Sequence, residues 1–119
     1  MHRNLNLASA TLVLLAALIP VTSCERTTQS AQPKVVTVAI RDYKFVPETV
    51  TVHQGDTVEW KNEDNVLHTA TADGQAQKPA FDSGNISKAA AWRYVAGTKG
   101  KVNYTCTFHP YMKGELTVQ

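Results

Sequence analysis

Three side chains that can bind a metal recur at every third position near the end of this 119-residue chain: Cys106, His109 and Met112. Soft sulfur ligands select copper, so a thiolate, an imidazole and a thioether together suit copper better than the other common metals. Zinc prefers cysteine, histidine and carboxylate ligands, and a thioether binds it poorly. We therefore predict that the fold is organised around this short loop and that the loop binds copper.

Such a site lacks one ligand, which should be a histidine from elsewhere in the chain. His68, in segment 65–70, can supply it. Two histidines and one cysteine in a trigonal plane, with a weak axial methionine, describe a type 1 (blue) copper centre that transfers electrons. The predicted metal ligands are His68, Cys106, His109 and Met112.

Each predicted ligand also has an ordinary structural interpretation. Cys106 could pack as a small buried hydrophobic residue, His109 could be an exposed loop histidine, and Met112 could fill the core. Three such residues on one spacing, with a histidine upstream, favour the metal site over these alternatives.

The motifs resemble those of the cupredoxin family, and the C-x2-H-x2-M loop most resembles the short loop of amicyanins. Plastocyanins and pseudoazurins share the fold and the ligand set. The resemblance covers about residues 35–119, where four further segments agree in order: 43–47 (YKFVP), 55–62 (GDTVEWKN), the His68 segment and 81–84 (FDSG). It implies an all-β, Greek-key β-sandwich of about seven or eight strands. It also implies one copper ion that cycles between Cu(I) and Cu(II), and a protein that carries single electrons and catalyses nothing.

The chain departs from the family pattern at two positions beside the predicted ligands. Many relatives have asparagine after the first histidine, where its side chain ties the two ligand loops together; here the residue is Thr69, whose hydroxyl could make a similar bond. Amicyanins commonly have proline before the second histidine, and this chain has Phe108. Phenylalanine keeps a backbone N–H, which is available to bond near the thiolate.

Alternating apolar residues predict short strands along the rest of the chain. Segment 35–40 is β-branched, His68 is expected on a strand, and segment 86–95 is expected to hold one or two strands. Tyr43 and Phe45 are two residues apart, so in a strand their side chains are expected on the same, apolar face. The expected core contains Val50, Val52, Val58, Trp60, Val102 and Tyr104.

The first 23 residues have the features of a secretion signal. Arg3 precedes an apolar run over residues 8–19, which is short for a transmembrane helix. Residues 21–24 (VTSC) resemble a bacterial lipobox, in which cleavage leaves Cys24 to be lipidated; a plain signal peptide is the alternative. We therefore expect a lipoprotein-type signal peptide at 1–23, a flexible polar tether at 24–33 and a cupredoxin domain at 34–119.

Cysteine usage and charge limit the partners. The second cysteine, Cys106, is assigned to the metal, so no internal disulfide is expected. Without Arg3, eleven basic residues face ten acidic ones, and the absence of a basic cluster argues against nucleic acid as a partner. We expect a monomer in the periplasm or cell envelope, anchored by lipid on Cys24, with redox proteins docking near His109.

Three functions are compatible with these sequence features. The first is an electron carrier. The second is a periplasmic protein that stores or delivers copper, although such proteins are usually richer in methionine than this chain, which has two. The third is a fragment of a copper enzyme, but a binuclear oxidase-type centre needs two cysteines in this loop and the chain has one there. The electron carrier is the prediction.

Overall fold

The computed structural model describes residues 32–74 and 80–119. These residues form eight strands joined by loops and turns, and they contain no helix. In this part of the chain, therefore, no helix is long and apolar enough to cross a membrane. The strands are β1 (Val35–Arg41), β2 (Lys44–Val46), β3 (Thr49–Val52), β4 (Thr57–Asn62), β5 (Thr71–Ala72), β6 (Ala91–Val95), β7 (Gly100–Thr105) and β8 (Lys113–Val118).

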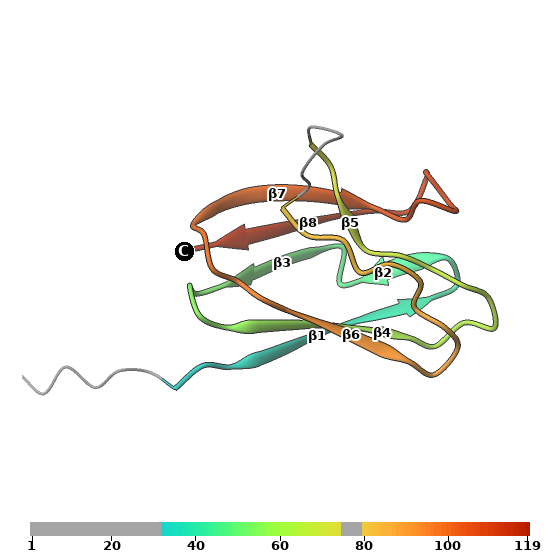
Figure 1. Ribbon diagram of the computed structural model, residues 1–119, viewed down its shortest axis with the longest axis horizontal. Helices are drawn as coiled ribbons and strands as arrows, with labels where there is room; N and C mark the ends of the chain where they lie inside the picture. The colour runs from blue at the N-terminus through green and yellow to red at the C-terminus, as the bar shows by residue number, and fades with distance from the viewer. Residues whose placement is uncertain (1–31, 75–79) are drawn as a thin grey trace, which may run out of the picture. The chain divides into compact units, whose positions relative to one another are not determined.

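The strands form two four-stranded sheets that pack face to face (Figure 1), one in the order β2-β1-β4-β6 and the other in the order β3-β8-β7-β5. Most neighbours are antiparallel, but each sheet contains one parallel pair, β1 with β4 and β3 with β8. This arrangement confirms the predicted all-β, Greek-key sandwich.

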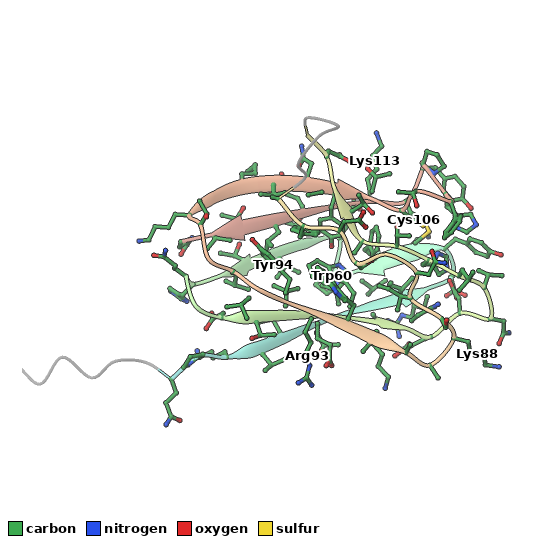
Figure 2. All side chains as sticks on the ribbon, viewed as in Figure 1. Trp60, Lys88, Arg93, Tyr94, Cys106 and Lys113 are labelled. Carbon is green, nitrogen blue, oxygen red and sulfur yellow. The ribbon has the colours of Figure 1, made fainter. Side chains whose placement is uncertain are left out.

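The core lies between the sheets because alternate strand residues point inward. Val50 and Val52 on β3 are buried, while Thr49 and Thr51 between them are exposed. Trp60, at the centre of β4, is completely buried and packs against aromatic rings from both sheets; Figure 2 shows it between the layers. Of the six predicted core residues, five are buried and Val102 is partly buried against the same cluster.

Two expectations about local structure were wrong. His68 is not part of a regular strand; it forms an isolated bridge with Ile86, and β5 begins only at Thr71. Tyr43 and Phe45 do not share a face: Phe45 is buried, whereas Tyr43 is 40% exposed in the turn between β1 and β2. Segment 86–95 contains one strand, β6, preceded by this bridge and a turn.

The predicted signal peptide, Cys24 and most of the predicted tether lie outside the described residues. Their assignments remain predictions.

Candidate metal centre

Three of the four predicted ligands meet at one end of the sandwich. The ligand atoms of His68, Cys106 and His109 all lie within 4.8 Å of one another. The Cys106 Sγ atom is 3.7 Å from His68 Nδ1 and 3.6 Å from His109 Nδ1. Ligand atoms about 2.0–2.3 Å from a metal in a trigonal plane should lie about 3.7 Å apart. The observed separations therefore fit two nitrogens and one sulfur around a single ion.

The three-residue spacing of the loop corresponds to two consecutive turns. The His109 N–H donates to the Cys106 carbonyl at 3.2 Å, and the Met112 N–H donates to the His109 carbonyl at 2.8 Å. The loop closes where the Cys106 N–H donates to the Met112 carbonyl at 3.2 Å. Each turn brings the next candidate ligand back toward the previous one, so the backbone itself gathers the three residues.

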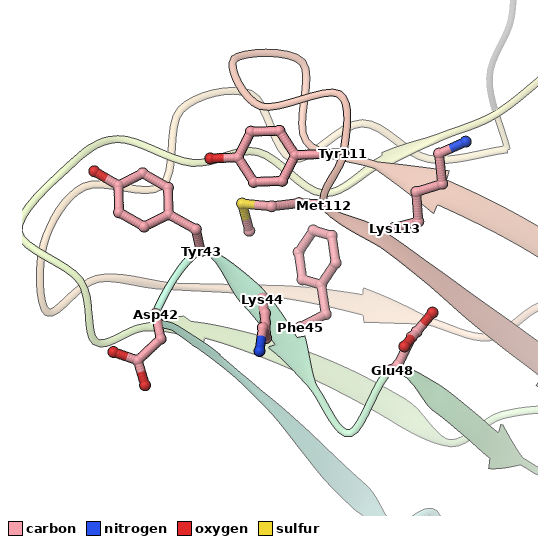
Figure 3. A pocket seen from close by; sticks show the side chains of 8 residues that line it. All are labelled: Asp42, Tyr43, Lys44, Phe45, Glu48, Tyr111, Met112 and Lys113. Carbon is pink, nitrogen blue, oxygen red and sulfur yellow. The ribbon is translucent and has the colours of Figure 1, made fainter.

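Met112 is buried, with 2% of its surface exposed. It lines a groove of about 300 Å³, and Figure 3 shows its sulfur between the rings of Tyr43 and Tyr111. The other residues lining the groove are Asp42, Lys44, Phe45, Glu48 and Lys113. The backbone hydrogen bonds of the loop place Met112 next to Cys106 and His109, and its thioether is the fourth candidate ligand.

His68 is completely buried and is fixed through its backbone and its ring. It exchanges two backbone hydrogen bonds with Ile86, at 3.2 and 2.8 Å. Burial lowers the pKa of His68, although the hydrogen bond to Asp64 opposes this effect. Nε2 lies 2.9 Å from Asp64 Oδ2, and a carboxylate can only accept, so Nε2 carries the proton. Nδ1 is then left with a free lone pair on the side of Cys106.

Thr69 joins the two ligand-bearing segments. Its hydroxyl accepts a hydrogen bond from the Thr107 N–H at 2.9 Å and lies 3.2 Å from the Thr107 hydroxyl. Its own N–H donates to Cys106 Sγ at 3.3 Å. The Thr69 hydroxyl therefore makes a bond between the two segments, as the sequence allowed, and the Thr69 amide is a backbone donor to the sulfur.

Two residues at the site were missed in the sequence. Asp64 was not among the predicted site residues, although it stands four residues before His68, a separation at which a local contact is plausible. Tyr43 was assigned to an apolar strand face, but its ring lies edge-on to both His68 and His109. Tyr43 begins the YKFVP segment, but no pattern in the sequence marks its contact with the histidines, because that contact depends on an unusual turn.

Comparison with known proteins agrees with the fold and the donor set. The family model described as a cupredoxin-like domain matches residues 11–118. The chain belongs to the cupredoxin-like family.

Among curated proteins, this cupredoxin is similar to amicyanin from Paracoccus versutus, with 32% identity over 85 residues that cover 71% of this chain and 64% of that protein. Amicyanin from Paracoccus denitrificans is 29% identical over 85 residues, covering 71% of this chain and 65% of its own. The matches thus span less than two thirds of either amicyanin.

Solved structures show the same relationship. A Cu(I) structure of an amicyanin variant matches with a TM-score of 0.66 and 26% identity, covering 71% of this chain and 82% of that one. A copper-containing nitrite reductase from Thermus scotoductus matches with a TM-score of 0.64 and 31% identity, but the match covers only 22% of that chain. The donor set of this cupredoxin fits one type 1 copper ion, and its similarity to amicyanins agrees with this assignment.

Proposed function

We propose that His68, Cys106, His109 and Met112 hold one type 1 copper ion, and that this cupredoxin passes single electrons between redox proteins without catalysing a reaction. The observation that carries the proposal is the convergence of one thiol sulfur and two imidazole nitrogens within 4.8 Å. Copper, when bound, supplies a one-electron couple between Cu(I) and Cu(II).

The residues around the site are arranged to keep its geometry fixed. Cys106 directly follows β7, His68 is pinned by its bridge to Ile86, and the bond between Thr69 and Thr107 ties the two segments together. Ligands held in this way move little when the charge at the site changes, so each transfer has a small reorganisation cost. The rigid positioning of the candidate ligands therefore favours a role in electron transfer.

The burial of the donor atoms supports a resident ion over one that is stored or delivered. Cys106 and His68 are completely buried, and Met112 nearly so. Copper exchange with a delivery partner requires access to the ligands, and here only His109 is partly exposed. A carrier that keeps its ion suits this arrangement better than a copper store.

Exposed apolar side chains surround the partly exposed His109 and support docking of redox partners there. We define the metal-end patch by three exposed residues that either adjoin His109 in sequence or contact its ring: Tyr43, Phe108 and Tyr111. Exposed apolar groups clustered in this way are typical of interaction surfaces. Electrons would then pass through the edge of His109.

We place the protein outside the cytoplasm, in the periplasm or cell envelope, with lipid on Cys24. This proposal rests on the apolar run and the VTSC motif of the leader. Mass spectrometry of the protein from its native membrane should find lipid on an N-terminal Cys24. A mature form with an unmodified thiol at that position would exclude the anchor.

The central test is to load the purified domain with Cu(II) and record its visible spectrum. An intense blue colour that disappears on one-electron reduction is expected for the wild type. Cys106→Ser should remain folded, since the core does not require the metal, but it should stay colourless. A folded wild-type domain that binds no copper, or binds it without colour, would exclude the proposed site.

A further inference from the structure

The carboxylate of Asp64 receives three N–H donors. Oδ2 lies 2.9 Å from His68 Nε2 and 3.0 Å from the backbone nitrogen of Tyr43, and Oδ1 lies 2.8 Å from the backbone nitrogen of Asp42. The Asp64 N–H in turn donates to Asn62 Oδ1 at 2.9 Å. One partly buried carboxylate therefore joins a candidate metal ligand to a turn more than twenty residues earlier in the chain.

The turn that Asp64 holds has an unfavourable backbone conformation. Asp42 has a φ of 52° and Tyr43 a φ of 56°. A left-handed conformation is uncommon for residues other than glycine, and for a bulky aromatic residue it persists only where the surroundings enforce it. The two backbone hydrogen bonds to Asp64 provide this constraint.

The same turn brings Tyr43 against both candidate histidine ligands. Its ring centroid is 5.5 Å from that of His68 and 4.9 Å from that of His109, with both pairs nearly perpendicular. Tyr43 is also part of the metal-end patch and lines the groove beside Met112 (Figure 3). Movement of the turn would therefore alter the contacts of both imidazoles and the shape of the patch.

We propose that Asp64 is a positioning residue that couples the metal site to the docking surface. It holds His68 in the form with the proton on Nε2, which leaves Nδ1 for the metal, and it fixes the turn that carries Tyr43. The inference rests on the proposed function, because its consequences for copper require the four-ligand site. A carboxylate that orients a metal-binding histidine also raises the basicity of that ligand.

Asparagine at position 64 cannot accept all three of the hydrogen bonds that Asp64 accepts. All three groups facing the carboxylate are N–H donors, so only an acceptor at both oxygen positions satisfies them. An asparagine whose oxygen faces His68 and Tyr43 would point its amide N–H at the Asp42 N–H. The opposite orientation would donate to His68 Nε2 and move the ring proton to Nδ1, where it blocks metal binding. The first orientation disturbs the metal site less, but it leaves the Asp42 N–H without its acceptor and so releases the turn.

The test compares Asp64→Asn with Asp56→Asn, a matched control. Asp56 also accepts two backbone N–H groups, from Lys34 and His53 at 2.8 Å each, but within the described residues no hydrogen bond joins it to a candidate ligand. In the metal-free protein, 15N NMR should show the His68 proton on Nε2 and slow exchange of the Asp42 and Tyr43 amides. Asp64→Asn should abolish this protection, weaken Cu(II) binding about 10–100-fold and raise the reduction potential, whereas Asp56→Asn should change none of these.

Two results would overturn the proposal. One is wild-type metal-free protein with the His68 proton on Nδ1, a measurement that remains decisive even if Asp64→Asn does not fold. The other is a folded Asp64→Asn variant with the copper affinity, potential and turn protection of Asp56→Asn. Failure of the proposed function looks different: the wild type itself would give no blue protein, while the NMR measurements on the metal-free form would still report on Asp64.

Discussion

The backbone N–H of Thr107 donates to the hydroxyl of Thr69 across 2.9 Å, and this bond joins the segment after His68 to the loop after Cys106. Thr71 donates to the same hydroxyl at 3.1 Å. Only 3% of the Thr69 surface is exposed, so water cannot readily replace its hydroxyl as the acceptor. A short side chain thus links the two ligand-bearing segments.

Thr69→Val should remove this link while nearly preserving side-chain volume. The Thr107 N–H would lose its acceptor, and the loss of this partly buried hydrogen bond should cost about 0.5–1.5 kcal/mol. Urea unfolding of the metal-free domain should show that loss, and the copper absorption band should shift. Thr51→Val, on the exposed side of β3, is the control and should change stability by less than about 0.5 kcal/mol. Equal effects of the two substitutions would contradict the linking role.

Gly114 allows Tyr104 to lie across the neighbouring strand. The two residues are paired between β7 and β8, and a Cβ atom on Gly114 would overlap the Tyr104 ring. Tyr104 is completely buried, so the ring has no free space into which to move. Gly114→Ala should therefore destabilise the domain by about 1–3 kcal/mol. Gly97→Ala is the matched control, since its added Cβ would approach no nearer than 4.0 Å to another atom.

Most of the fold could be predicted because its strands have one buried and one exposed face. The alternation of Val50 and Val52 with threonines, and of Val58 and Trp60 with charged residues, depends only on the two-residue period of a strand. The Cys106 loop was equally informative, because its ligand spacing is local and the turns that gather it are formed by the loop's own backbone.

The remaining features depend on contacts between distant parts of the chain. His68 is positioned by a bridge to Ile86, eighteen residues later, and not by a strand of its own. Tyr43 reaches the two histidines only because Asp64 holds an unfavourable turn. Neither relationship leaves a periodic signal, so the sequence predicted the candidate ligands but not the residues that orient them.

Asp56 should make stability depend on pH in the acid range. Hydrogen bonds from the backbone N–H groups of Lys34 and His53 lower the pKa of Asp56 below its ordinary value of 3.8. Because the folded pKa is lower than the unfolded one, the stabilisation is complete well above pH 3.8 and is lost as the pH falls below it. Asp56→Asn should thus be less stable at neutral pH and lose less stability on acidification. Parallel pH profiles of unfolding free energy would contradict this.

Met112→Leu should show that the proposed axial ligand affects the copper site less than the other three ligands do. Leucine fills a similar volume but offers no thioether, and the axial bond is weak, so the blue colour should persist. The reduction potential should rise, because the sulfur no longer stabilises Cu(II). Visible spectra and voltammetry of the loaded protein check both effects. If Met112→Leu lost its colour as completely as Cys106→Ser, the axial assignment of Met112 would be wrong.

Tyr111→Lys should slow electron exchange without disturbing the copper spectrum. Tyr111 is 68% exposed and lies beside His109, with ring centroids 6.0 Å apart, so the substitution puts a charge into the metal-end patch without removing a ligand. The chain carries a formal net charge of only +2, and docking that depends on apolar contact should weaken only modestly with salt. The measurement is the second-order rate constant for electron exchange with a redox partner, physiological or surrogate, across ionic strengths.

Lys61→Gln and Lys88→Gln, at exposed positions outside the patch, are the controls and should leave the rate almost unchanged. If these two variants slow transfer and Tyr111→Lys does not, partners dock elsewhere on the domain.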